Sequence, residues 1–191
     1  MYRALKEAKE TRHDSIWHFL LRNTYQPFFL KQQFDVVVDN PPWFTYNAVE
    51  NADYQARLLR LATAYHLKPA RKALMPQLEI AAIFLAHAAS YLLRPGGRLA
   101  FVLPRAFLSA DQHAATRLGT AQGFRLTGIW DLKDMQPLFP VPACVLFAEA
   151  TPVPRPLPVE GLPGRRYAGR PRRRNATWDE AADRLTTTDV T

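Results

Sequence analysis

Residues 35–43 read Asp-Val-Val-Val-Asp-Asn-Pro-Pro-Trp, a β-branched run that stops abruptly at two prolines. Three consecutive valines predict a strand, and the lack of polar alternation favours a strand buried on both faces, as in a parallel sheet. Pro41 and Pro42 have no backbone N–H and fix their own φ angles, so the strand has to end there. We therefore predict a stiff loop at the carboxyl end of a strand, where open α/β sheets bind their ligands.

The predicted loop offers a distinctive set of groups. Asn40 contributes an amide side chain, Trp43 an indole ring, and the prolines contribute carbonyls with no competing N–H. Amide and carbonyl oxygens accept hydrogen bonds from an amino group, and an indole stacks on a flat ring. The loop is therefore suited to a flat aromatic ring that carries an amino group.

The rest of the chain predicts an α/β fold. An Ala- and Leu-rich helix is expected over residues 78–93, followed by a turn at Pro95-Gly96-Gly97 and a buried strand over 98–103. This strand-helix-strand order implies a parallel crossover unit. The remaining expected elements are helices at 3–22 and 110–121, a partly helical segment at 44–76, strands at 124–131 and 143–148, and a loop at 133–142.

The composition is that of one globular domain. The chain has 191 residues, and 48% of them are hydrophobic. No apolar run approaches the roughly 20 residues that span a membrane, and the N-terminus has no hydrophobic signal core. Cys144 is the only cysteine, which excludes an internal disulfide and a cysteine-rich zinc site. The sequence therefore indicates a cytoplasmic protein that does not bind membranes.

The positive charge is concentrated near the C-terminus. The net charge is +8, and residues 155–174 hold seven arginines against one acidic residue, Glu160. Interspersed prolines predict an extended linker rather than a packed element. These arginines suit phosphate contacts with a nucleic acid and equally suit a solvated linker. We therefore divide the chain into an N-terminal helix and connector (1–33), a core unit (34–150) and a Pro/Arg-rich tail (151–191).

Three motifs together resemble those of S-adenosylmethionine-dependent DNA adenine-N6 methyltransferases of the large restriction-modification type. In chain order they are Asn40-Pro41-Pro42-Trp43, then Pro95-Gly96-Gly97-Arg98-Leu99, then Leu138-Phe139-Pro140. The resemblance covers residues 34–150. It implies a partial Rossmann-like class I methyltransferase fold: the second half of a mostly parallel sheet, with an antiparallel strand near the edge.

The resemblance also implies a chemistry for the loop. The Asn40 side-chain oxygen and the Pro41 carbonyl would accept the two N–H bonds of adenine N6 and direct its lone pair at the methyl donor. The adenine has to be flipped out of the duplex, and Trp43 and Phe139 would stack on its two faces. Asp39, where the family often has a small residue, is compatible with cofactor contact, with capping of a backbone N–H, or with exposure to solvent.

The family cofactor, S-adenosylmethionine, binds mainly at a glycine-rich loop that precedes the Asn-Pro-Pro-aromatic motif in this type. Residues 1–39 contain no glycine, and Gly96 is the first in the chain. We therefore expect a fragment that lacks the cofactor-binding half, does not bind the cofactor alone, and is inactive by itself. Its expected partners are DNA and either the missing N-terminal half or a separate specificity or restriction subunit. Without the missing strands, Val36, Val37 and Val38 would form an exposed edge.

Alternative functions also fit parts of the sequence. A methyltransferase of the same fold acting on a protein glutamine or an RNA guanine has a similar loop, and a non-catalytic nucleic-acid-binding remnant is a third interpretation. The five histidines show no metal-ligand spacing, so no metal site is predicted. Arg105, just past the strand at 98–103, suits either a phosphate contact or an ordinary surface position.

Overall fold

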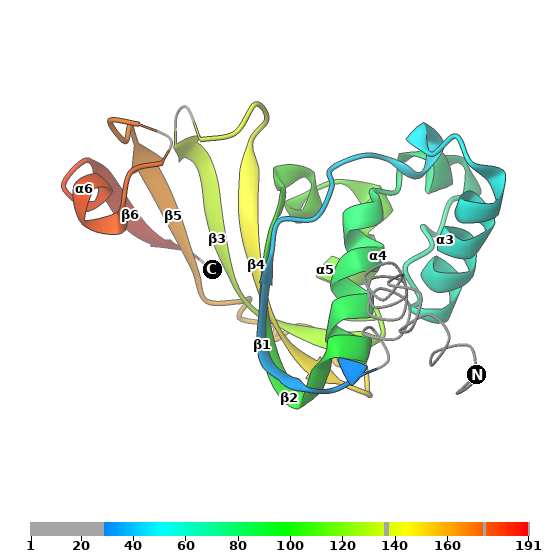
Figure 1. Ribbon diagram of the computed structural model, residues 1–191. Helices are drawn as coiled ribbons and strands as arrows, with labels where there is room; N and C mark the ends of the chain where they lie inside the picture. The colour runs from blue at the N-terminus through cyan, green and yellow to red at the C-terminus, as the bar shows by residue number, and fades with distance from the viewer. Residues whose placement is uncertain (1–28, 136–137, 174, 191) are drawn as a thin grey trace, which may run out of the picture.

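A computed structural model describes residues 29–135, 138–173 and 175–190, so the helix expected at 3–22 lies outside the described residues. Six strands form one sheet in the order β1-β2-β4-β3-β5-β6 (Figure 1). β1, β2, β3 and β5 run in one direction, and β4 and β6 run in the other. Their bounds are β1 (Phe34–Asp39), β2 (Leu93–Pro104), β3 (Gly123–Met135), β4 (Ala143–Thr151), β5 (Gly164–Gly169) and β6 (Leu185–Val190).

The helices are short, and two begin at side-chain caps. Asn51 accepts the Tyr54 N–H at the start of α3, and Thr177 forms a capping box with Glu180 at the start of α6. No helix among the described residues is long and apolar enough to cross a membrane. The helices are α3 (Ala52–Ala64), α4 (Ile80–His87), α5 (Ala114–Arg117) and α6 (Trp178–Ala182), with a π-helical turn at Ala88–Leu92 and 3-10 helices at Tyr46–Ala48, Lys72–Gln77, Arg105–Leu108 and Asp111–His113.

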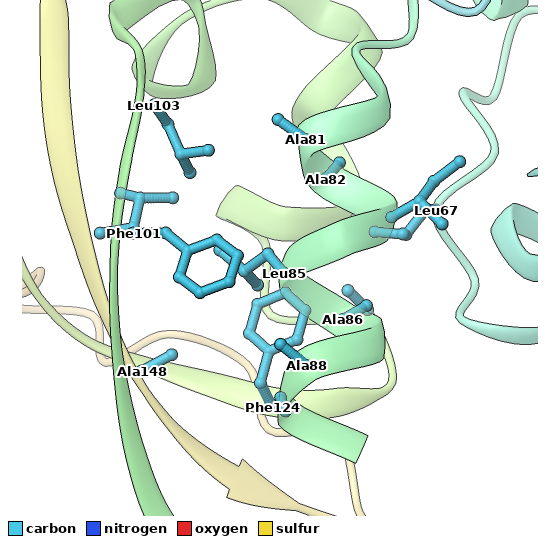
Figure 2. Close-up of a cluster of buried hydrophobic side chains, with 14 of the residues drawn as sticks. Leu67, Ala81, Ala82, Leu85, Ala86, Ala88, Phe101, Leu103, Phe124 and Ala148 are labelled. Atoms are coloured by element: carbon cyan, nitrogen blue, oxygen red, sulfur yellow. The ribbon is translucent and has the colours of Figure 1, made fainter. Parts of the chain in front are cut away.

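The main core lies between α4 and one face of the sheet. α4 is apolar nearly all round, with six of its eight residues buried, which is typical of a helix enclosed by other elements. Figure 2 shows Phe101 and Leu103 of β2 pointing towards this helix, with Phe124 of β3 beside them. Complete burial of one such side chain contributes about 1.5–3 kcal/mol to folding. This core fixes the position of β2. Through the sheet it also fixes the loops at the carboxyl ends of β1 and β2.

β1 and β2 are parallel neighbours, and α4 lies between them in the chain, so the predicted crossover unit is confirmed. Phe34 pairs with Leu93 whereas Val36 pairs with Arg98, so residues 94–97 form an excursion from the ladder. This excursion is the predicted Pro-Gly-Gly turn, which lies within a strand rather than before it.

The valines of β1 differ from the first expectation. Val36 is 58% exposed and Val38 is 73% exposed, while Val37 packs against the core. The expectation of a strand buried on both faces was therefore wrong for this chain. β1 is the outermost of the described strands on its side of the sheet, which agrees with the exposed edge expected there.

Two other segments differ from the sequence prediction. Residues 164–190 add β5, α6 and β6 to the sheet, where an extended linker was expected, so the antiparallel strand β4 lies inside the sheet. The helix expected over 110–121 is reduced to a 3-10 turn and the one-turn α5, which ends at Arg117 with Leu118 as its C-cap, before Gly119, whose φ is +69°. A positive φ is incompatible with continuing a right-handed helix.

Candidate active site

The loop after β1 is stiff and partly packed. Pro41 is buried, whereas Asn40 and Pro42 are exposed. The Asp39 Oδ1 atom accepts the backbone N–H of Asn40 at 2.8 Å. Of the three roles left open for Asp39, this contact corresponds to the capping of a backbone N–H. The loop therefore holds its backbone in place and leaves the amide of Asn40 on the surface.

Trp43 connects this loop to the neighbouring strand. Its indole Nε1 donates a hydrogen bond to the carbonyl oxygen of Val102 in β2 at 3.2 Å. The ring of Trp43 also meets the ring of Phe139, with centroids 5.1 Å apart and planes inclined at 46°. The structure thus brings together two aromatic residues, distant in sequence, that were each predicted to stack on the same base.

Phe139 lies in the loop between β3 and β4, beside a pocket of about 280 Å³. A base inserted between two rings needs two contacts of roughly 3.5 Å, which places the ring planes about 7 Å apart. The observed centroid separation of 5.1 Å is smaller, so one ring has to move before a base can enter between them. The pocket is lined by Leu132, Lys133, Met135, Phe139, Pro140, Val141, Pro142 and Ala143.

A buried carboxylate lies at the base of the same loop. Asp131, in β3, is only 3% exposed. Arg105 donates to both of its oxygens, from Nε to Oδ1 at 2.9 Å and from Nη2 to Oδ2 at 3.1 Å. Oδ1 also accepts the backbone N–H of Lys133 at 3.1 Å, and Arg166 Nε lies 3.6 Å from Oδ2. Burial alone would raise the pKa of Asp131, but these hydrogen bonds and charges together hold the pKa below its ordinary value.

Asp131 was not singled out in the sequence, and Arg105 was assigned only to phosphate or to the surface. In the structure the guanidinium of Arg105 forms an ion pair with Asp131, a role that the sequence did not predict. A signal for the pair is present in the sequence. Asp131 ends one predicted strand and Arg105 follows another, so both lie at strand ends.

Several described arginines of the tail lie in β5 and in the segment before α6. Arg165 Nε lies 3.6 Å from Asp189 of β6, and Arg173 donates to Glu180 of α6 at 2.8 Å. Arg166 reaches the loop base through Asp131. Arg165, Arg166 and Arg173 therefore lie on or next to an extension of the sheet that carries the Asn-Pro-Pro-Trp loop.

The histidines of the described residues belong to no cluster of metal-ligating side chains. His113 is 1% exposed and stacks on Phe107 with ring centroids 3.8 Å apart. Its Nε2 lies 3.6 Å from Glu79 Oε2. Among the described residues there is no group of three or more His, Cys, Asp or Glu side chains that could hold a metal ion.

Residues 3–139 match the family described as Eco57I restriction-modification methylase, which is most of the chain. No curated protein matches the sequence. The similar solved structures are much longer proteins, and this chain spans less than half of each of the three given below.

A nuclease-deletion mutant of the Type ISP restriction-modification enzyme LlaGI, in complex with a DNA substrate mimic, is 11% identical with a TM-score of 0.53, covering 89% of this chain and 18% of that one. The DrdV–DNA complex is 16% identical with a TM-score of 0.50, covering 82% of this chain and 17% of that one. A Listeria monocytogenes protein described as a class I S-adenosylmethionine-dependent methyltransferase is 20% identical with a TM-score of 0.47, covering 81% of this chain and 41% of that one. At these identities the first two likenesses show a shared fold.

Proposed function

Because the chain belongs to the Eco57I restriction-modification methylase family, we propose that it forms the catalytic-loop part of a DNA methyltransferase that methylates N6 of adenine. S-adenosylmethionine would supply the methyl group. We assign no residue of this chain to the methyl donor, since its first glycine is Gly96, in the turn within β2. A donor-binding half and DNA are the partners that this function requires, with a separate specificity or restriction subunit as a further partner.

The proposed chemistry depends on hydrogen-bond acceptors at the loop. The exocyclic amine of adenine is a poor nucleophile, because its lone pair is delocalised into the ring. The Asn40 side-chain oxygen and the Pro41 carbonyl would accept its two N–H bonds and orient the lone pair away from the ring plane. Buried Pro41 and the bond from the Asn40 N–H to Asp39 support this role, since they fix the backbone that carries both acceptors.

The observation that carries the proposal is the contact of Trp43, three residues after Asn40, with Phe139 of the β3–β4 loop. A target base has to leave the duplex before a group reaches its amine, and an extruded base needs aromatic surfaces on which to stack. The exposed arginines of β5 support DNA over a protein glutamine as substrate, because cationic side chains attract a phosphate backbone.

The proposal is tested by substituting Asn40. DNA is incubated with S-adenosylmethionine and the chain, alone and combined with the donor-binding half of a related methylase. The digested nucleosides are then analysed by mass spectrometry for N6-methyladenine. We expect product in the combined reaction and its loss in Asn40→Ala, because the acceptor oxygen is removed. Asn47→Ala, which changes an exposed asparagine of the following 3-10 helix, is the matched control and should keep activity.

Three results would contradict the proposal. Unchanged product in Asn40→Ala would remove the proposed role of the amide. Methylation of cytosine in place of adenine would make the base assignment wrong. Methyl transfer to protein or RNA, with none to DNA, would favour the alternative that the chain belongs to an enzyme acting on a protein glutamine or an RNA guanine.

A further inference from the structure

Asp131 and Arg105 connect three segments at the base of the Phe139 loop. Arg105 follows β2, Asp131 lies in β3, and the described residues 138–142 lead into β4. Arg105 donates to both carboxylate oxygens of Asp131, the bidentate geometry that a planar guanidinium favours. The Asp131 side chain is 4% exposed, so little water competes for these bonds.

Backbone hydrogen bonds extend this contact to both sides of the loop. The Arg105 N–H donates to the carbonyl oxygen of Pro142 at 2.8 Å, just before β4 begins. The Lys133 N–H donates to Asp131 Oδ1 at 3.1 Å, on the β3 side. Phe139 lies between these two points in the chain, so both approaches to it are bonded to the Arg105–Asp131 pair.

Removing one member of such a pair disturbs more than one bond. Without the carboxylate, Arg105 loses its partner and the Lys133 N–H loses its acceptor. Asp131 is the buried member of the pair, so removing Arg105 leaves a buried charge without its closest partner, which is costly and favours rearrangement of the surrounding backbone. The described residues of the loop, 138–142, belong to no helix or strand, so the bonds at the loop base contribute to holding them.

We propose that Arg105 and Asp131 are positioning residues that hold the β3–β4 loop so that Phe139 faces Trp43. The role of Phe139 in stacking on a base rests on the proposed function. The placement of Phe139 against Trp43 does not depend on it. Arg166 of β5 contributes a further charge at 3.6 Å from Asp131, which connects the arginine-rich tail to the same loop.

The test measures the contact between the two positions without DNA. Phe139→Cys is labelled with bimane, whose emission is quenched when it touches an indole, and the Trp43→Phe background gives the unquenched reference. Labelling is selective, because Cys144 is buried and burial raises its pKa to about 12. In the otherwise unchanged chain we expect strong quenching by Trp43.

Asp131→Asn is the decisive variant. We expect emission to rise to nearly that of the Trp43→Phe reference, because the loop no longer holds position 139 against the indole. Glu149→Gln is the matched control, since Glu149 accepts from Arg125 at 2.8 Å across β3 and β4 at the other end of these strands. It should leave the quenching unchanged.

Quenching that stays at the wild-type level in folded Asp131→Asn overturns the proposal, as does an equal loss in Glu149→Gln. If Asp131→Asn does not fold, as judged by circular dichroism, Arg105→Lys decides. Lysine keeps the charge beside Asp131 but cannot form the two-pronged contact. Raised emission there supports the proposal, and full quenching refutes it.

This outcome is separate from that of the methylation assay. If quenching does not depend on Asp131, the positioning role fails while the effect of Asn40→Ala on methylation still stands. If Asn40→Ala leaves methylation unchanged, the proposed function fails while the fluorescence result still describes how the loop is held.

Discussion

The indole of Trp43 and the ring of Phe139 are held in different ways. Trp43 donates to the carbonyl of Val102, so its position follows that of β2, whose neighbours in the sheet are β1 and β4. Phe139 lies in a loop that is bonded at its base. Widening their 5.1 Å separation to the roughly 7 Å that a base requires therefore moves Phe139 rather than Trp43.

Substitution of Phe139 should reduce methylation of DNA without abolishing it. Loss of one stacking surface costs about 1–3 kcal/mol per base, or roughly 5- to 150-fold. We expect Phe139→Ala to lower kcat/KM by a factor in this range, and Phe139→Tyr to restore most of the loss because it keeps an aromatic face. Steady-state methylation kinetics measure this. Wild-type kcat/KM in Phe139→Ala would show that the ring only packs within its loop.

At the scale of elements, the excursion of residues 94–97 lets β1 lie against β2. A Cβ added at Gly97 would lie 2.9 Å from the Arg94 carbonyl oxygen and 3.2 Å from that of Asp35 in β1. Both neighbours are backbone atoms, which cannot move aside as a side chain can. Gly97 thus permits the close approach of the two strands, while Gly96, with a φ of +77°, turns the chain into open space.

Gly97→Ala should therefore destabilise the fold. We expect a loss of about 1–3 kcal/mol in the free energy of unfolding, the range for crowding in a packed site. Gly96→Asn is the matched control and should cost much less, because asparagine tolerates a positive φ and nothing lies within 4 Å of that position. Urea denaturation of the two variants measures the difference. Equal stabilities would mean that β1 shifts to accept the methyl group.

Local signals in the sequence predicted β1, α4 and the 98–103 part of β2, because each has a strong apolar pattern and a proline or glycine at its end. The tail was mispredicted as a linker because its prolines and arginines obscured β5. A signal for β6 was available in Thr186, Thr187 and Thr188, since β-branched residues favour strands. The sequence places Arg105 and Asp131 at the ends of two predicted strands, but their pairing arises from tertiary packing, which no local pattern specifies.

At the scale of the molecule, β1 is the outermost described strand on its side of the sheet, and its exposed side chains include Val36 and Val38 between Asp35 and Asp39. An edge strand with exposed apolar side chains can pair with a strand of another chain. We expect the isolated chain to self-associate as its concentration rises, and Val38→Lys to reduce this association. Val159→Lys, at a fully exposed loop position, is the control and should not. Sedimentation velocity over a concentration series measures both. A monomeric wild-type chain that unfolds cooperatively at high concentration would contradict the expectation.

The position of β4 determines when the sheet can assemble. β4 lies between β2 and β3, although it follows both in the chain. During synthesis on the ribosome, β3 emerges before the strand that joins it to β2. β1 and β2 can therefore pair early around α4, whereas β3 waits until residues 143–151 have left the exit tunnel. Long-range pairing of this kind is slow, so the arrival of β4 limits when β2 and β3 can be joined into one sheet.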